Sequence, residues 1–311
     1  MKLFSFLVIS FLILISNTIS AQNTYEFMRL DMSARAGALG GTFVANHDDP
    51  NVIFYNPAGL KLLEESPISF SFFKHLLDIN LASLSYSTEL KGIGRVGGGI
   101  KYINYGTFQG ATEDGLKTNE FGAGEIAFIL GYANELDENF YYGVNAEFIY
   151  SSIEEHSSSA IGLDLGLHYN IPSSEANIGF SILNLGTQLS SYINTKEDLP
   201  LDVMFGASKK LEHLPLRLSL DFHRLNKDRD DFVSRLKAFT VGAEFILSKA
   251  LRLRLGYDNE KRTELKIGSF AGIAGFNAGL GIAISDYNFD YGFSSMGLIG
   301  ALHRISISTK L

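Results

Sequence analysis

The feature that most constrains the fold is an alternation of apolar and polar residues with a period of two, which recurs from about residue 66 onward. In one segment Leu216, Leu218, Leu220 and Phe222 alternate with polar residues. Successive side chains of a β-strand point to opposite faces, whereas a helix places its apolar residues three and four positions apart. The pattern therefore predicts an all-β chain.

Fourteen segments show this alternation. They lie at about residues 67–73, 79–89, 94–105, 122–134, 140–154, 158–170, 175–185, 200–211, 214–226, 235–247, 250–258, 274–284, 287–294 and 302–310. Many approach the roughly 9–11 residues that a tilted strand needs to cross a bilayer. Short and long connections alternate between them, as in barrels with short periplasmic turns and longer external loops. Residues 66–311 are therefore predicted to form a 14-stranded antiparallel outer-membrane β-barrel.

The last segment has one apolar face and one polar face. Ile305, Ile307, Thr309 and Leu311 point one way, and the residues between them point the other. Such a strand would be an unprotected edge in a soluble sheet. In a closed barrel it has a neighbour on each side and its apolar face meets lipid. We therefore expect these four residues to mark the membrane-insertion strand.

The first 22 residues have the pattern of a secretory signal peptide. Lys2 precedes an apolar run from Leu3 to Ile15, and the small residues Ser20 and Ala21 follow. The run is too short to span a bilayer, which favours a cleaved signal over a membrane anchor. No later segment has the roughly 18 consecutive apolar residues of a membrane helix. We expect export, and location in the outer membrane of a Gram-negative bacterium.

Residues 23–65 do not alternate in this way. They carry charged residues such as Arg29 and Asp31, and Pro50 and Pro57 restrict the backbone into a turn-rich segment. A segment of about forty residues has too little core of its own and needs the barrel wall for burial. We expect it to be a small N-terminal plug segment inside the barrel; a separate periplasmic domain is the alternative.

No pattern of residues indicates catalysis or a cofactor. The chain has no cysteine, which excludes disulfides and thiolate metal sites, and its seven histidines form no metal-binding motif. His168 and His223 lie on the polar phase of their segments, where we expect solvated residues that face the lumen. We therefore expect no catalytic residue, no cofactor and no metal, although a Ser–His pair assembled only by the fold is an alternative that the sequence leaves open.

Two further motifs have simpler explanations than ligand binding. Residues 92–97, GIGRVG, match a dinucleotide fingerprint in letters, but they lead into a strand rather than a helix. The charged run 226–231 is interrupted by Arg229, so a solvated external loop fits it better than a calcium site. The formal net charge of −8 argues against nucleic acid as a partner.

The N-terminal motifs resemble those of the FadL-like family of outer-membrane barrels. The plug-motif residues that this resemblance implies are Ser33, Arg35, Gly40, Gly41, Asn56 and Pro57, within SARAGALGG and NPAGL. Within that family the chain looks closest to the PorQ type, which belongs to the type IX secretion system of Bacteroidetes. Stretches such as residues 206–220 and 263–282 carry this closer resemblance.

The resemblance implies a non-enzymatic barrel that anchors a PorZ-like surface protein of the type IX attachment complex, which processes and attaches exported cargo. Its expected partners are that surface protein and outer-membrane lipid. The polar loops Gly106–Phe121 and Gly186–Leu199 are candidate contacts, but the residues that bind the partner are unknown. The alternative is a FadL-like transporter of hydrophobic small molecules with a lateral opening. A strand kink within Gly268–Gly281 is a candidate for that opening, although an external loop that folds inward fits this stretch equally well.

Overall fold

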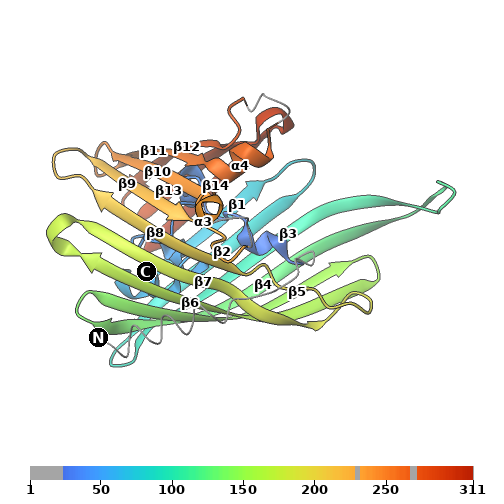
Figure 1. Ribbon diagram of the computed structural model, residues 1–311, viewed down its shortest axis with the longest axis horizontal. Helices are drawn as coiled ribbons and strands as arrows, with labels where there is room; N and C mark the ends of the chain where they lie inside the picture. The colour runs from blue at the N-terminus through green and yellow to red at the C-terminus, as the bar shows by residue number, and fades with distance from the viewer. Residues whose placement is uncertain (1–23, 228–231, 267–271, 311) are drawn as a thin grey trace.

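The computed structural model describes residues 24–227, 232–266 and 272–310, and its fourteen strands form one closed antiparallel barrel (Figure 1). The predicted signal peptide and Leu311 lie outside these residues. The strands are β1 (Pro67–Lys74), β2 (Asn80–Leu90), β3 (Gly94–Ala111), β4 (Lys117–Asp137), β5 (Phe140–Ile153), β6 (His156–Ile171), β7 (Ala176–Ser190), β8 (Asp202–Lys210), β9 (Leu216–Phe222), β10 (Phe239–Ile246), β11 (Leu251–Asp258), β12 (Phe276–Ile284), β13 (Tyr287–Ser295) and β14 (Ala301–Lys310).

Short helices lie between and before the strands. They are η1 (Glu26–Arg29), α2 (Ala34–Ala38), η2 (Pro50–Phe54), η3 (Pro57–Leu62), η4 (Pro172–Ser174), α3 (Phe232–Arg235), α4 (Asn259–Glu264) and η5 (Gly297–Ile299). The helices before β1 belong to the N-terminal segment, which packs against the inner face of the strands. In the described part of the chain, no helix is long and apolar enough to cross a membrane.

The ladder is continuous from each strand to the next, and β14 closes it against β1 from the pair Pro67–Lys310 to the pair Lys74–His303. Side chains alternate across this wall. The outward ones are apolar and exposed, as at Phe70, Phe128, Phe148, Leu167, Leu220, Leu255, Phe289 and Ile305. The inward ones are largely polar or glycine and are buried, as at Ser85, Asn145, Asp164, Asp221, Glu244 and Arg304. A closed wall with an apolar exterior is the arrangement that spans a bilayer.

The two rims of the barrel differ in their connections. On one rim the strands are joined by the turns 91–93, 138–139, 172–175, 211–215, 247–250 and 285–286, and this is called the short-turn rim below. The opposite, long-loop rim carries the connections 75–79, 112–116, 154–155, 191–201 and 296–300, together with the described parts of the connections between β9 and β10 and between β11 and β12. By the pattern of bacterial barrels the short-turn rim is periplasmic.

All fourteen predicted strands are present, and Ile305 and Ile307 lie on the exposed outer face as expected. One expectation for the long-loop rim was wrong. Most of Gly106–Phe121 is strand rather than loop, because β3 and β4 run on as a hairpin that projects beyond the neighbouring strands (Figure 1). Of the two interpretations of Gly268–Gly281, the kinked strand is not found in the described residues 272–281, because β12 pairs in register with β11 and β13.

A charge on the lipid-facing side of β14 should destabilise the barrel according to its depth. We expect Ile305→Lys to lower the free energy of unfolding by about 2–4 kcal/mol, because Ile305 lies midway along the strand. Thr309→Lys, near the end of the same strand, is the control and should cost at most about 1 kcal/mol. Urea titration of protein folded into lipid vesicles measures both values, and equal costs would contradict the membrane position assigned to β14.

Candidate functional site

The N-terminal segment crosses the lumen from one rim to the other, and it is called the plug below. At its start Thr24 N donates to Asp198 O, which lies in a connection of the long-loop rim. At its end Leu62 and Glu64 line a cavity that β14 and β11 also border near the short-turn rim. The candidate functional site is therefore the plugged lumen, whose properties depend on how the plug is held.

Two of the predicted motif residues shape the plug locally. Ser33 is the N-cap of α2, and its hydroxyl accepts a hydrogen bond from Ala36 N at 3.0 Å. Asn56 caps η3 through its Oδ1, and its Nδ2 donates to Val44 O at 2.9 Å and to Leu167 O of β6 at 3.0 Å. Side-chain oxygens at N-caps satisfy backbone N–H groups that a helix leaves unpaired. Asn56 also ties the plug directly to the wall.

The wall meets the plug through inward-facing glycines, because only a residue without a side chain lets two backbones approach this closely. A Cβ added at Gly143 would collide with the backbone of Pro57 and Ala58, and one added at Gly256 would collide with Leu39 and Gly40. Among the described residues the glycines whose added Cβ would meet the plug within 3.4 Å are Gly97, Gly99, Gly131, Gly143, Gly166, Gly179, Gly206, Gly242, Gly256, Gly279 and Gly292. These residues, called the glycine ring below, lie on ten of the strands.

The remaining glycines of the motif lie on the plug side of this contact. Gly40 and Gly41 have φ values of +73° and +85°, which other residues rarely adopt. A Cβ at Gly40 would lie 3.2 Å from Tyr257 N on β11, and one at Gly41 would lie 2.9 Å from a carboxylate oxygen of Asp31. The ALGG motif therefore makes a tight reversal directly against the wall.

Arg35 is the charged link between plug and wall. Its guanidinium donates to both carboxylate oxygens of Glu244 on β10, with Nε–Oε2 and Nη2–Oε1 distances of 3.0 and 2.9 Å. Glu244 also accepts from Arg254 at 2.7 Å, and Arg254 in turn bonds Asp290 at 2.5 Å. Because all of these side chains are buried, each charge depends on its neighbours for compensation.

Asp48 completes this network from the plug. It bonds Arg35 at 2.9 Å and Arg217 of β9 at 2.8 Å. Desolvation alone would raise the pKa of the Asp48 carboxyl, but Arg217 and Arg35 hold it well below its usual range. Likewise, burial alone would lower the pKa of the Arg35 guanidinium, while Asp48 and Glu244 raise it above its ordinary value. Both groups are therefore charged in the folded protein.

Other wall residues hold the plug backbone directly. Asp221 of β9 accepts from the amides of Phe43 and Val44 at 2.6 and 2.8 Å. Lys101 of β3 donates to Met28 O at 2.6 Å, and Arg304 of β14 donates to the carbonyl of Asp31 at 2.8 Å. Such bonds satisfy plug backbone groups that the lumen removes from water.

The histidines differ from the sequence prediction. His168 was expected to be solvated, but it is fully buried against the plug, where its ring lies 5.6 Å from that of His47. His223 is only partly buried and bonds Thr240 Oγ1 through Nε2 at 3.0 Å. The polar phase of a strand correctly predicted that both rings face inward, but the plug takes the place of the expected water.

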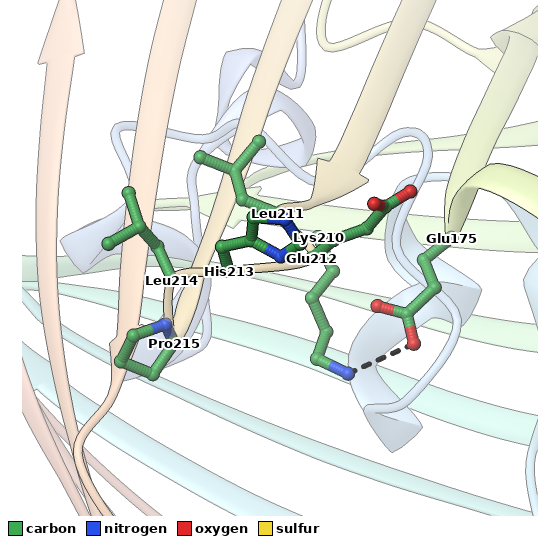
Figure 2. Close-up of a pocket in the computed structure, with 7 residues that line it drawn as sticks. All are labelled: Glu175, Lys210, Leu211, Glu212, His213, Leu214 and Pro215. Carbon is green, nitrogen blue, oxygen red and sulfur yellow. Dashed lines mark hydrogen bonds and ion pairs between the residues drawn. The ribbon is translucent and has the colours of Figure 1, made fainter.

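Two cavities lie towards the short-turn rim. The one beneath the plug has a volume of about 240 Å³ and a lining of mixed charge that includes Arg35, Asp48 and Arg252. The other, about 480 Å³, is an open hollow at the β8–β9 turn, lined by residues 210–215 and Glu175 (Figure 2). Its ion pair, Lys210–Glu175 at 3.1 Å, is about half exposed on both sides and confers little stability.

The wall has an irregularity at β7. The β7–β8 ladder ends at the pair Leu183–Asp202, although β7 continues to Ser190 and remains paired with β6. Asn184 adopts a φ of +59° and the register with β6 shifts beside it, so the strand bulges. The connection 191–201 runs beside the unpaired edge, where Pro200 O accepts from Asn184 Nδ2 at 3.1 Å.

Comparison with known proteins identifies the fold. No protein-family model matches the sequence, and no curated protein matches it. Solved structures do match. The Ralstonia pickettii toluene transporter TbuX has a TM-score of 0.61 at 13% identity, covering 90% of this chain and 98% of the transporter. The Pseudomonas putida toluene transporter TodX has a TM-score of 0.59 at 13% identity, with the same coverage of 90% and 98%.

A Pseudomonas aeruginosa FadL homologue is also similar, with a TM-score of 0.57 at 8% identity over 90% of this chain and 99% of that chain. This class of structure is the closed, FadL-like barrel of fourteen antiparallel strands, and the present chain has the same fold. At these identities the likeness concerns the fold alone.

The glycine ring makes a sharp prediction about volume. Gly143→Val should lower the free energy of unfolding by about 1–3 kcal/mol or displace the plug, because the new side chain meets plug backbone. Gly98→Val is the matched control, since Gly98 faces outward and an added Cβ meets nothing closer than 4.0 Å. Urea titration and protease digestion of the plug provide the two readouts, and equal effects of the two substitutions would rule out the proposed contact.

The buried charge network predicts that breaking a buried ion pair costs more stability than breaking an exposed one. Glu244→Gln leaves Arg35 and Arg254 without their shared counter-charge, so we expect a loss of about 3–5 kcal/mol in the free energy of unfolding. Lys210→Gln removes the exposed pair with Glu175 and should cost less than about 1 kcal/mol. Denaturant midpoints of the two variants measure the difference, which should be absent if the network contributes no more than a surface pair.

Proposed function

We propose that this chain is an outer-membrane channel for hydrophobic small molecules in a Gram-negative bacterium. The observation that carries the proposal is the interruption of the β7–β8 ladder in a barrel with the fold of the toluene transporters. Because the plug is held by the glycine ring and by buried charges, a route straight through the lumen would require that all of these contacts break. A side exit avoids this cost.

The surroundings of the interruption favour an apolar solute. Leu183, Met204 of β8 and Val44 of the plug form a buried apolar cluster next to the last pair of the ladder. Leu199 of the neighbouring connection is also buried, and Leu185 and Leu189 on the outer face are exposed. The free energy of an apolar molecule falls when it moves from water to such a surface and then to the bilayer. Movement of the irregular segment 191–201 would open this route without breaking a strand ladder.

A transport assay tests the route. Met204→Trp enlarges a buried side chain in the apolar cluster, so we expect uptake of toluene by cells that express the protein to fall at least tenfold. Ile178→Trp, on the outward face of β7, is the control and should leave uptake unchanged. Uptake that does not depend on the protein at all would contradict the channel.

A second candidate is the anchoring role that the sequence resemblance implies, in which a PorQ-type barrel holds a PorZ-like surface protein of the type IX attachment complex. The observation that favours it is the β3–β4 hairpin (Figure 1). Residues 106–111 of β3 have no pairing with β2, which ends at the pair Asn80–Asn104, and residues 117–121 of β4 pair with β3 alone. Unpaired strand edges on a rigid base are common sites of protein contact.

The exposed surface of the hairpin suits a protein partner. Phe108 and Phe121 stack with ring centroids 5.5 Å apart near its base, and Glu113, Asp114 and Glu120 lie exposed further out. Aromatic side chains within a polar surround are typical of protein interfaces. In this role, as in the channel, the barrel acts without catalysis, and outer-membrane lipid is the partner of its outer wall.

Shortening the hairpin separates the two candidates. Replacing residues 107–121 by a two-residue Asn-Gly turn should abolish co-purification of a surface protein from detergent-solubilised outer membranes if the barrel is an anchor. The same change should leave toluene uptake intact if the barrel is a channel. An equivalent replacement of residues 297–299 is the control for loop truncation. If neither co-purification nor uptake depends on the protein, both candidates are wrong.

A further inference from the structure

His47 of the plug and His168 of β6 form a histidine pair across the boundary between plug and wall. Their ring centroids lie 5.6 Å apart with an interplanar angle of 72°. The side chain of His168 has no exposed surface. The Nδ1 atoms of both rings are buried and have no hydrogen-bond partner. Buried ring nitrogens without a partner are uncommon in native proteins and require an explanation.

The tautomer of His168 can be assigned from its other nitrogen. Nε2 lies 3.2 Å from Asn177 Oδ1, which can only accept, so Nε2 carries the proton. Asn177 is itself oriented by a contact of its Nδ2 with Ser208 Oγ at 3.5 Å. The Nδ1 atom of a neutral ring with a protonated Nε2 is a bare lone pair. Such a lone pair, buried next to a second histidine, can bind a metal ion or accept a hydrogen bond.

His47 is suited to the same chemistry. Burial is the main cause that lowers the pKa of the His47 imidazole; Asp48 acts in the opposite direction, and Arg217 and Arg35 lower the pKa further. Metal ions bind the neutral form of an imidazole ring. His47 also lines the cavity of about 240 Å³ beneath the plug, so its side of the pair borders a space near the short-turn rim.

We propose that His47 and His168 bind a divalent transition-metal ion, such as Zn²⁺, that joins the plug to the barrel wall. Zn²⁺ binds imidazole nitrogens at about 2.0–2.1 Å in tetrahedral sites, which places the ring centres of two ligands about 5–6 Å apart. The observed separation of 5.6 Å meets this requirement. The Nε2–Asn177 hydrogen bond is the outer-shell contact that orients a ligating histidine and increases its basicity.

The other positions around the ion would be filled by water from the cavity. Among the described residues no group of three or more His, Cys, Asp or Glu side chains is placed to hold a metal. Asp48, the neighbour of His47, is already bonded to two arginines. A two-histidine site with water ligands binds imidazole-preferring ions such as Zn²⁺ and Cu²⁺ rather than Mg²⁺ or Ca²⁺. Because it joins two parts of the fold, the ion would stabilise the folded state by mass action.

Full-length protein folded in detergent micelles provides the test, with Zn²⁺ and Cu²⁺ as probes. We expect Zn²⁺ to raise the melting temperature and EDTA to reverse the rise. The Cu²⁺ electron paramagnetic resonance spectrum should show hyperfine coupling to two imidazole nitrogens. Mg²⁺ should have neither effect.

Three substitutions distinguish the site from adventitious binding. His47→Gln and His168→Gln should each weaken Zn²⁺ binding by more than a hundredfold, and Asn177→Leu should weaken it by about ten- to a hundredfold. His213→Gln is the control, since His213 is exposed on the β8–β9 turn. The Zn²⁺-induced shift is compared within each variant, so a general loss of stability does not imitate loss of the site.

Two results would overturn the proposal. One is a wild-type protein whose melting temperature does not respond to Zn²⁺, which would assign the space between the rings to a buried water. The other is a Zn²⁺ response that survives in both His47→Gln and His168→Gln, which would place the bound ion elsewhere on the chain.

Discussion

Closure of the backbone ladder is the constraint on which the rest of the structure depends. In the bilayer a backbone N–H or C=O without a partner costs several kcal/mol, so a sheet can exist there only if its first and last strands pair. Here β1 pairs with β14 along the full length of β1. Closure fixes the circumference of the wall and hence the space inside it. The end of β7 lacks β8 as its neighbour, and there the connection 191–201 lies beside it.

The space inside is narrow, and the residues that face it reflect this. Where the plug backbone approaches most closely, the wall has glycine. Where backbone N–H and C=O groups of the plug face the wall, Asp221, Lys101 and Arg304 form hydrogen bonds with them. The ion network around Glu244 adds directional contacts between the two parts. Shape and charge therefore act together to give the plug one position.

The strands could be predicted from the sequence because lipid on one side and polar lumen on the other impose a period of two on every membrane-crossing segment. The same reasoning failed where that contrast ends. The outer part of the β3–β4 hairpin has solvent on both faces, so its residues do not alternate, and they were predicted as a loop. The prediction of a solvated His168 was also wrong, because a period of two shows which face of the strand a residue lies on but not what covers that face.

Contacts between the plug and the wall were beyond prediction for a related reason. Arg35 and Glu244 are 209 positions apart, and no local pattern records their pairing. A signal for the glycine ring was nevertheless present. Glycines such as Gly166 and Gly256 occupy the polar phase of their strands, where a water-filled lumen would favour larger polar residues. Because glycine recurs at inward positions on many of the strands, the pattern indicates that another segment of backbone packs against the wall.

The glycine ring also makes substitutions in two distant parts of the sequence depend on each other. A methyl group gained on the wall has to be matched by one lost on the plug, as where Gly279 meets Ala38 and Gly292 meets the backbone of Ala34. We therefore expect substitutions in the plug to occur together with substitutions at the inward glycines of ten strands. A plug taken from a related barrel would fit only if the inward residues that contact it were transferred as well.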